Sequence, residues 1–252
     1  PGGKEQIAGE YQPGWMLLSY GKKVSVSSSL EGYPAENIVD EDARTAWVAQ
    51  SNRDMEWAQV DLQRLSSIHA IQVNFDEYGA NQKGAVSGVY QSYLIYASVN
   101  GEDWSLVVDY GTKKTDTPHD YIEFEEPFKA RYIKLQNKEY MVSENFSVRD
   151  LRIFGKGQGS TPRAVNDFTV ERDEADPCKA RLCWEAVPDA QGYIVRYGIA
   201  GDKLYNNFQV MGENTLEIGS LNKGVAYYFT IDAYNAVSYT HLRAHETGAY
   251  LV

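Results

Sequence analysis

The sequence predicts an all-β protein built from two β-sandwiches in succession. Aromatic residues, which favour strands, make up 13% of the chain. Short segments that alternate apolar and polar residues recur along the chain, and turn residues separate them, as in sandwiches and barrels. The Gly- and Ser-rich stretch GKGQGSTP at 155–162 divides two unlike series of such segments, which predicts a domain boundary.

The first series of segments predicts one domain over residues 16–155. It follows a Gly- and Pro-punctuated start at 1–15, which we interpret as a linker or the end of an upstream domain. An Asn-Gly step within 99–104 is a strong hairpin signal. The strands expected in this domain are 24–29, 56–62, 68–75, 92–98, 121–126, 131–137 and 148–155.

The second series predicts a smaller domain over 162–235, after a linker at 156–161. Its segments do not repeat those of the first domain, so we expect two different β domains rather than an internal duplication. The strands expected here are 168–172, 179–187, 192–198, 214–221 and 226–235.

The charge of the chain limits the kinds of partner. The formal net charge is −11, which argues against a nucleic-acid partner because binding to phosphates is driven mainly by basic residues. An acidic surface also favours neutral ligands over polyanionic ones. No stretch approaches the ~20 consecutive apolar residues of a membrane helix, so we expect no membrane span.

Five motifs of the first domain, in the same order, resemble the discoidin or coagulation factor 5/8 type C family, which includes carbohydrate-binding module family 32. The motifs are YPAENIVDEDARTAWVA (33–49), EWAQVDLQRLSSIHAIQV (56–73), YLIYASVNGEDWSLV (93–107), ARYIKLQN (130–137) and VRDLRIFG (148–155). The resemblance implies a jelly-roll β-sandwich that binds its ligands with loops at one end.

The resemblance also points to candidate ligand-binding residues in these loops. An aromatic ring can cover the apolar face of a sugar while polar side chains bond to its hydroxyls. The candidates are Tyr33, Tyr78, Asn81, Asn145 and Phe146. The alternative for each is an ordinary turn tyrosine or loop amide. Trp47 and Trp57 occupy positions that the family uses for its core, and we expect both to be packed, with Trp104 partly packed.

Three oxygen-bearing residues, Asp40, Asp42 and Thr45, lie within one predicted tight turn. This spacing suits Ca²⁺, which binds carboxylate, hydroxyl and carbonyl oxygens. The resemblance supplies a distant fourth ligand, Asp150, at a position where the family more often has Glu. The sequence thus predicts a structural Ca²⁺ site, and the alternative is that these acids cap the amides of the turn.

No motif of a catalytic site is apparent in the chain. A glycosidase needs two carboxylates that flank the bond, but an acidic surface contains many such pairs by composition alone. His69 lies in a predicted strand and His119 in a Pro-flanked turn. We therefore expect this fragment to be non-catalytic.

The second domain resembles a fibronectin type III domain, an immunoglobulin-like sandwich. In CWEAVPDAQGYIVRYG, Trp184 is expected to enter the core, and Tyr193, Val195 and Tyr197 alternate on the next strand. Tyr227 in LNKGVAYYFTIDAYN is the expected tyrosine-corner residue, whose hydroxyl bonds to the backbone near the preceding turn. Such domains are usually spacers, so we assign no site to it.

The end of the chain has two interpretations. His241, His245 and Glu246 could share a helix face and hold a metal ion. However, one reading frame of a transposase adapter used in DNA sequencing encodes residues 237–247 without a mismatch, and its continuation encodes Leu251 and Val252. We therefore interpret 236–252 as adapter-derived, expect it to be frayed or irregular, and expect the fibronectin sandwich to lack its last native strand.

Together these features predict the accessory region of a secreted polysaccharide-degrading enzyme. The segment YQPGWMLLSYGKKVSVSS (11–28) resembles the junction after the catalytic propeller of glycoside hydrolase family 43. The expected partners are a plant or host glycan and an upstream catalytic domain of the same chain. The resemblance implies a secreted, periplasmic or cell-surface location in a bacterium. The alternatives are an adhesion or protein-interaction module with no sugar ligand, or a domain that only braces the enzyme.

Overall fold

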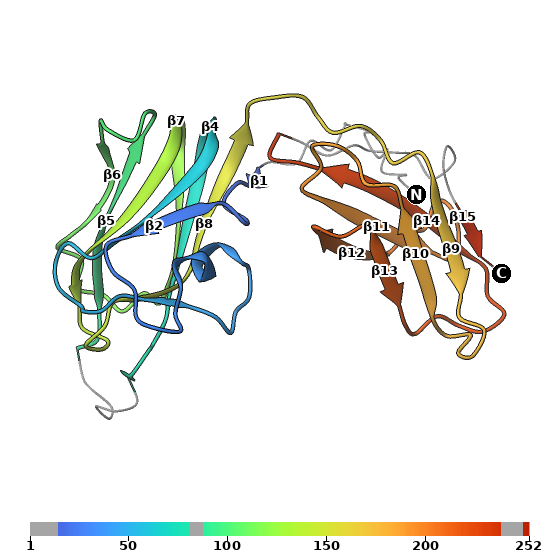
Figure 1. The fold of residues 1–252 in the computed structure, drawn as a ribbon, viewed down its shortest axis with the longest axis horizontal. Coiled ribbons are helices and arrows are strands. Elements are labelled where there is room, and N and C mark those ends of the chain that lie inside the picture. Colours follow the sequence, from blue (N-terminus) through green and yellow to red (C-terminus); the bar gives the residue numbers. More distant parts are fainter. Residues whose placement is uncertain (1–14, 81–87, 238–248, 252) are drawn as a thin grey trace, which may run out of the picture. The chain divides into compact units, whose positions relative to one another are not determined.

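The computed structural model describes residues 15–80, 88–237 and 249–251, and the described chain consists of strands and one short 3₁₀ helix, η1 (Ala35–Val39) (Figure 1). This confirms the all-β prediction. The described residues contain no helix with the length and apolarity needed to cross a membrane. The chain separates into two units, of which the first comprises Trp15–Gln158 and the second contains the strands that follow it.

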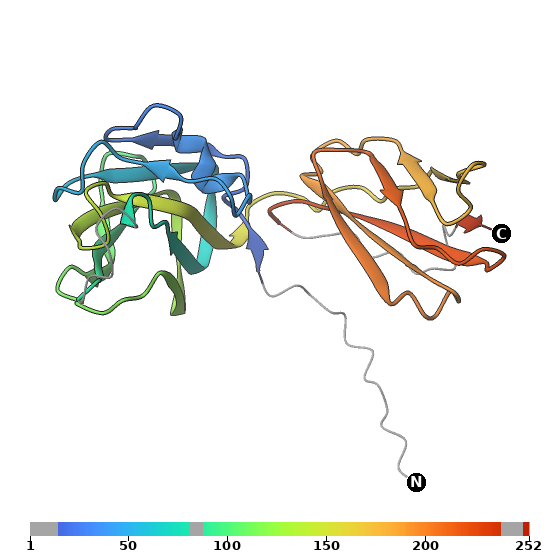
Figure 2. The same cartoon turned by 90° about the horizontal axis from the view of Figure 1, so that it is seen from below.

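The first unit is a β-sandwich of eight strands. Six of them form the path β1-β8-β4-β7-β5-β6, while β2 pairs with β4 and β3 with β8. Figure 2 shows the strands wrapping around a common interior. The strands are β1 (Met16–Leu17), β2 (Lys23–Val26), β3 (Trp47–Val48), β4 (Trp57–Phe75), β5 (Gln91–Ser98), β6 (Ser105–Tyr110), β7 (His119–Tyr140) and β8 (Ser147–Gly157).

Strand β4 joins two segments that the sequence predicts as separate strands. Its register against β7 is interrupted between Asp61 and Ser66, where Gln63 has a left-handed φ of 64°. Before the interruption β4 pairs with β2, and after it β4 pairs with β8. The irregularity therefore lets one strand change neighbours and close the sandwich, as β-bulges do in other sheets.

The core of the first unit follows from the alternation within its strands. In β4, Ala58, Val60 and Leu62 are buried, and the side chains between them are not. A cluster of rings fills the end of the core that lies under the loops, where Phe75 is 5.3 Å from Tyr93 and 6.1 Å from Tyr140 between ring centroids. Burial of such large side chains is the main stabilising contribution to the fold.

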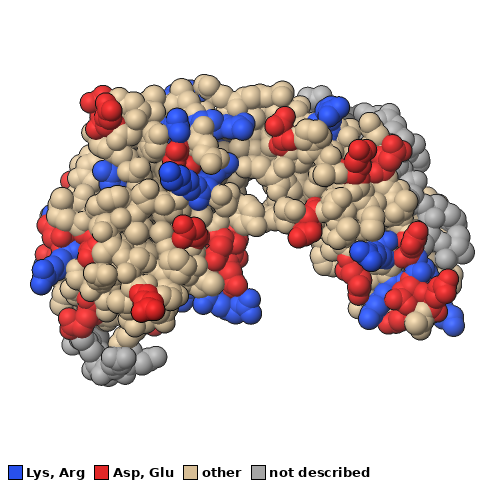
Figure 3. Space-filling view, viewed as in Figure 1, with Lys and Arg blue, Asp and Glu red and all other residues tan. Residues whose placement is uncertain are grey.

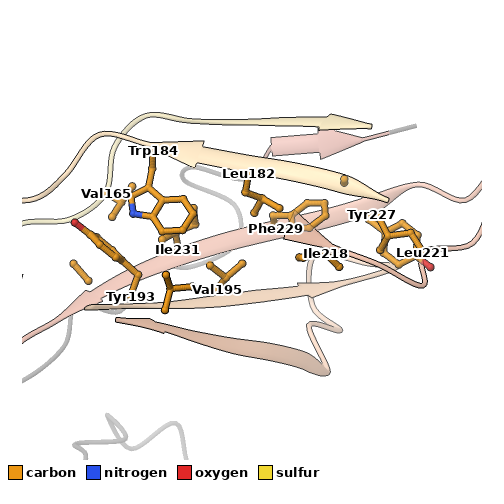
Figure 4. Close-up of a cluster of buried hydrophobic side chains, with 13 residues drawn as sticks. Val165, Leu182, Trp184, Tyr193, Val195, Ile218, Leu221, Tyr227, Phe229 and Ile231 are labelled. Atoms are coloured by element: carbon orange, nitrogen blue, oxygen red, sulfur yellow. The ribbon is translucent and has the colours of Figure 1, made fainter. Parts of the chain in front are cut away.

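The second unit is a sandwich of a three-stranded and a four-stranded sheet, with the orders β13-β10-β9 and β12-β11-β14-β15. Figure 4 shows its core between them. The strands are β9 (Phe168–Arg172), β10 (Ala180–Trp184), β11 (Gly192–Gly198), β12 (Asn206–Met211), β13 (Thr215–Ile218), β14 (Tyr227–Tyr234) and β15 (Ala249–Leu251).

Several residues of this unit lie as the sequence predicts. Trp184 is buried in the core, together with Tyr193 and Val195. Tyr197 packs against this core and stacks on Phe229, with ring centroids 5.6 Å apart. The hydroxyl of Tyr227 accepts a hydrogen bond of 3.0 Å from the backbone N–H of Asn222, the contact expected of a tyrosine corner.

The end of the chain contributes one short strand. β15 pairs antiparallel with the Tyr227–Phe229 part of β14. The three residues of β15 are therefore in regular structure, although the segment was expected to be frayed or irregular. His241, His245 and Glu246 lie outside the described residues, so the derivation of the segment from an adapter stays a prediction and its metal-binding alternative stays untested.

Candidate functional site

Four loops meet at one end of the first unit. They are the segments 27–34, 49–56, 76–80 and 141–146. Backbone hydrogen bonds join the second and fourth of these loops, Ala49 N–H to Phe146 O (2.8 Å) and Phe146 N–H to Ser51 O (2.9 Å). Two more bonds join the other loops to the adjacent strand ends, Leu30 N–H to Val48 O (2.7 Å) and Asp76 N–H to Ser147 O (3.1 Å). This set, here called the loop end, is therefore one continuous surface rather than four independent loops.

The loop end brings together Tyr33 and Tyr78, two residues predicted to bind ligand. Their ring centroids are 4.9 Å apart at an interplanar angle of 69°, an edge-to-face arrangement. Both side chains are partly exposed. Gly32 (φ 85°) and Gly79 (φ 71°) have left-handed backbones beside the two tyrosines, a conformation that glycine adopts without steric cost. The turns that present the rings therefore depend on these glycines.

Asn145 belongs to the same surface but has a structural contact. Its side-chain Nδ2 donates a hydrogen bond of 2.9 Å to the carbonyl oxygen of Ala49. This bond holds the 141–146 loop against the 49–56 loop. Asn81, the other predicted amide, lies outside the described residues.

Phe146 is a core residue, which corrects its assignment as a ligand contact. Its side chain is completely buried and packs edge-to-face against Trp47 and Tyr140, with ring centroids 5.8 and 5.3 Å away. The reason is the backbone pairing of Phe146 with Ala49 and Ser51 on one neighbouring segment. This pairing makes Phe146 the start of the strand pattern that β8 continues, so its side chain points inward.

Glu56 is a residue of the loop end that the sequence analysis missed. Its carboxylate accepts hydrogen bonds from the hydroxyls of Ser27, Ser28 (2.8 Å) and Ser51 (2.7 Å). Burial alone would raise the pKa of Glu56, but these hydrogen bonds and nearby Arg53 outweigh it, and the pKa is lowered.

This carboxylate also explains where the first predicted strand ends. The segment 24–29 was expected to be extended throughout, yet β2 stops at Val26. Ser27 and Ser28 instead turn to Glu56, so the serine run belongs to the loop end. The only sequence signal was three successive serines, whose hydroxyls commonly bond within loops.

The loop that carries Tyr78 is anchored from below. The Asp76 carboxylate pairs with Arg149 at 2.6 Å, and its backbone oxygen accepts hydrogen bonds from the hydroxyls of Tyr140 and Ser147. Burial raises the pKa of the Tyr140 hydroxyl, which therefore stays protonated and donates. Residues under the loop thus fix the position of the aromatic pair above it.

The four predicted calcium ligands are not assembled into one shell. Thr45 Oγ1 donates to Asp40 (2.8 Å), whose other oxygen accepts the Asp42 N–H (2.9 Å). Asp42 forms two hydrogen bonds with the Arg44 guanidinium, which hold the pKa of Asp42 at about 2. Asp150 accepts a hydrogen bond of 2.9 Å from Asn74. Within the described part of the chain, no three Asp, Glu, His or Cys side chains are placed to hold one metal ion. These hydrogen bonds favour the capping alternative, and the calcium site, whose ligands would include Thr45 and backbone carbonyls, stays a prediction.

The turn at 40–45 is instead tied to β8 by an ion pair. Arg152 donates from Nε and Nη2 to the two carboxylate oxygens of Glu41, at 3.0 and 2.9 Å. Glu41 has a left-handed φ of 60°, which is unfavourable for a residue with a Cβ. The pair therefore links the turn directly to β8.

Trp47 and Trp57 have different environments, although both were expected to be packed. Trp47 is completely buried. Trp57 is partly exposed on the outer face of β4, because Ala58 beside it points into the core and side chains alternate along a strand. Trp104 is partly exposed as well, in agreement with its expected partial packing.

Comparison with known proteins gives one family and a set of structural relatives. The sequence profile of the F5/8 type C domain matches residues 23–150. Rat lactadherin (Rattus norvegicus) is 33% identical over 110 residues, which are 41% of this chain and 25% of lactadherin. Mouse lactadherin (Mus musculus) is 32% identical over 110 residues, 41% of this chain and 23% of that protein. The chain thus spans about a quarter of the length of these relatives.

Two solved structures illustrate the similarity in three dimensions. Chitosan-binding module 2 of a chitosanase/glucanase from Paenibacillus sp. IK-5, in complex with chitotriose, is 19% identical with a TM-score of 0.47, covering 55% of this chain and 99% of the module. The family 32 carbohydrate-binding module of NanJ from C. perfringens, in complex with galactose, is 18% identical with a TM-score of 0.44, covering 56% and 98%.

The family assignment depends on the sequence profile. The match covers slightly more than half of the chain, and its range contains β2 to β7, the loop-end tyrosines and most of the core of the first unit. The chain belongs to the F5/8 type C domain family.

Proposed function

We propose that the first unit is a non-catalytic carbohydrate-binding module that contacts its ligand with the Tyr33–Tyr78 pair. The observation that carries this proposal is the edge-to-face contact of two partly exposed tyrosines from loops far apart in the sequence. Such a pair presents ring surface to the C–H face of a sugar and hydroxyls to its edge.

Polar side chains beside the pair complete the proposed site. Gln50 is exposed, and its amide lies 3.3 Å from the carbonyl oxygen of Ser29, whose own hydroxyl bonds to the backbone of Tyr33. Glu77 is exposed next to Tyr78. These groups can bond to sugar hydroxyls, and Asn145 and Glu56 hold the loops that present the rings.

The test is glycan binding by the full chain, first on an array and then by calorimetry. We expect Tyr33→Ala and Tyr78→Ala each to weaken binding about tenfold or more, as loss of a stacking ring costs ~1–3 kcal/mol. Tyr205→Ala is the matched control, because Tyr205 is 77% exposed but lies in the second unit. Unchanged affinity in both loop-end variants, or no glycan bound by the wild type, would reject the proposal.

For the second unit we propose a fibronectin type III spacer. The buried Trp184 and the Tyr227–Asn222 contact support this assignment. The exchange of Tyr227 for Phe removes one hydrogen bond, and we expect it to lower the unfolding midpoint of this unit without affecting glycan binding.

We further propose that the chain is the accessory region of a secreted bacterial glycoside hydrolase of family 43, with 236–252 derived from a sequencing adapter. The support is the resemblance of the junction at 11–28 and the match of 237–247 to the translated adapter. Sequencing the gene without interruption tests both points. An upstream gene region that encodes no propeller, or a genuine genomic codon for each of 237–247, would contradict them.

A further inference from the structure

The outer face of β4, β7 and β5 in the first unit carries aromatic, amide and cationic side chains together. The strand register places Lys134 directly between Gln59 of β4 and Tyr96 of β5, and it places Trp57 opposite Gln136. We call this surface the Lys134 face. Its residues are Trp57, Gln59, Tyr96, Trp104, Tyr132, Lys134 and Gln136, all partly exposed.

Lys134 is flanked by two indoles. Its Nζ lies 3.8 Å from the ring centroid of Trp104 and 5.8 Å from that of Trp57. Trp57 reaches it from β4, on one side of β7, and Trp104 reaches it from the connection between β5 and β6, on the other side of β7. Tyr132 extends the aromatic surface, with its ring centroid 6.5 Å from that of Trp104.

Two other cations of the same strand have carboxylate partners, whereas Lys134 and Lys129 have none among the described residues. Arg131 pairs with Asp61 at 2.8 Å and Lys138 with Asp54 at 2.5 Å. Among the residues that the structure describes, the Lys134 ammonium lies over two aromatic rings and pairs with no carboxylate. Burial lowers the pKa of Lys134, as expected for a partly desolvated cation with no anion beside it.

The neighbouring amides have spare hydrogen-bonding capacity. Gln136 donates to the thioether sulfur of Met55 at 3.1 Å, and a thioether is a weak acceptor that a better one can replace. Gln59 presents a second amide on the other side of Lys134. A ligand with hydroxyls and one carboxylate could place its hydroxyls on the two amides and its carboxylate on the Lys134 ammonium.

We propose that the Lys134 face binds a neutral glycan chain that carries an isolated uronate. The Lys134 ammonium pairs with the carboxylate, the indoles of Trp57 and Trp104 cover apolar sugar faces, and Gln59 and Gln136 bond to hydroxyls. The proposal is independent of the function proposed for the loop end, with which it shares no residue.

The overall acidity of the chain determines how much charge the ligand can carry. A polyanion would be repelled by a molecule of net charge −11. On the first unit, acidic and basic side chains lie side by side, as Figure 3 shows for one face. Since charges are screened over about 8–10 Å in physiological salt, the local cation dominates for a single carboxylate. A uronate branch on a neutral chain has a low total charge and still offers one carboxylate to Lys134.

Calorimetry with the full chain tests this proposal. The probe is a xylo-oligosaccharide with one glucuronate branch, and the comparison ligand is xylotetraose, which has no carboxylate. We expect the acidic ligand to bind at least tenfold more tightly than xylotetraose, because a charge-assisted hydrogen bond is stronger than one between neutral groups. This preference should fall as NaCl is added.

Variants separate this surface from the loop end. Lys134→Met keeps the aliphatic stem, and we expect it to abolish the preference for the acidic ligand. Trp57→Ala and Trp104→Ala should weaken both ligands, while Tyr33→Ala should leave the preference unchanged. Thermal unfolding of each variant shows whether it is folded, and a ¹³C NMR titration of Lys134 should show its pKa rising when the acidic ligand binds.

Each outcome decides one proposal. Equal binding of the two ligands, or a preference that survives in Lys134→Met, would overturn the Lys134 face. If the wild type binds neutral glycans through Tyr33 and Tyr78 but shows no acid preference, only the present inference fails. If the acid preference depends on Lys134 and no glycan depends on the tyrosines, only the loop-end function fails.

Discussion

At the scale of single residues, Phe146 and Trp57 have the reverse of their expected roles. Phe146 lies in a loop sequence, yet it is completely buried against other rings. Trp57 belongs to a strand motif, yet it lies on the outer face. Backbone pairing decides which face of the sandwich each side chain occupies. Phe146 pairs with Ala49 and Ser51, and Trp57 pairs with β7.

The burial of Phe146 leads to a stability prediction. Phe146→Ala leaves a cavity among Trp47, Phe75 and Tyr140, so we expect a loss of about 3–5 kcal/mol in the free energy of unfolding. Tyr33→Ala, in a partly exposed loop tyrosine, should cost far less. Urea unfolding of the first-unit transition measures both. Equal, small losses would show that Phe146 is not part of the core.

Glu56 leads to a pH prediction. Its pKa is lower in the folded chain, so its contribution is present above the unfolded pKa of about 4.3 and is lost as the pH falls through the folded value. Gln offers one oxygen to three serine hydroxyls, and we expect Glu56→Gln to destabilise the chain by about 1 kcal/mol at pH 7, allowing for solvent screening.

The measurement for Glu56 is the difference in unfolding free energy between wild type and variant at pH 7 and near pH 3. This difference should shrink as the pH falls through the lowered pKa of Glu56, because the wild-type carboxyl then becomes protonated. A difference that does not depend on pH would mean that the three serines do not hold a charged group.

At the scale of elements, the turn at 40–45 is held in place by side-chain hydrogen bonds and an ion pair. Its acids were expected to bind Ca²⁺ together with Asp150. In the structure the turn amides and Thr45 use Asp40, while Glu41 is held to β8 by Arg152. The capping alternative that the sequence left open describes Asp40 and Asp42 better than the metal alternative does.

This ion pair gives a prediction for the turn. We expect Arg152→Gln to lower the unfolding free energy by about 0.5–1 kcal/mol, the range for partly exposed pairs. Arg44→Gln is the control, because the Arg44 side chain is 88% exposed and should contribute little. The melting temperature of the wild type should be the same in EDTA and in CaCl₂, measured by calorimetry. A rise with CaCl₂ would restore the calcium prediction.

At the scale of the whole molecule, the chain consists of two sandwiches with separate cores. The first unit ends at Gln158, and the strand pairings of β1 to β8 all lie within it. The second has its own cluster around Trp184 and Phe229. Each unit therefore contains the buried surface that a domain needs to fold.

We expect residues 15–158 to fold alone. The fragment should unfold in one cooperative transition, and it should retain whatever glycan affinity the full chain shows, since both proposed surfaces lie within it. Circular dichroism and calorimetry of the fragment test this. An aggregated or unfolded fragment, beside a folded full chain, would show that the second unit is needed for the stability of the first.

The sequence by itself determined the all-β class and the strand series. Alternation along a strand is a local property, so it places Ala58, Val60 and Leu62 on one face of their strand, but the expected packing of Trp57 favoured the other face as the core. The burial of Trp184 and the contact of Tyr227 were implied by the resemblance to fibronectin type III domains, whose motifs lie within one or two neighbouring strands.

Only the tertiary structure decided which of the candidate site residues lie together. The contact of Tyr33 with Tyr78, the burial of Phe146 and the serine contacts of Glu56 each join segments distant in sequence. Local patterns cannot show which loops meet, because that depends on strand order and register. The position of Lys134 between two indoles also depends on the tertiary structure, since these rings belong to another strand and to a connection.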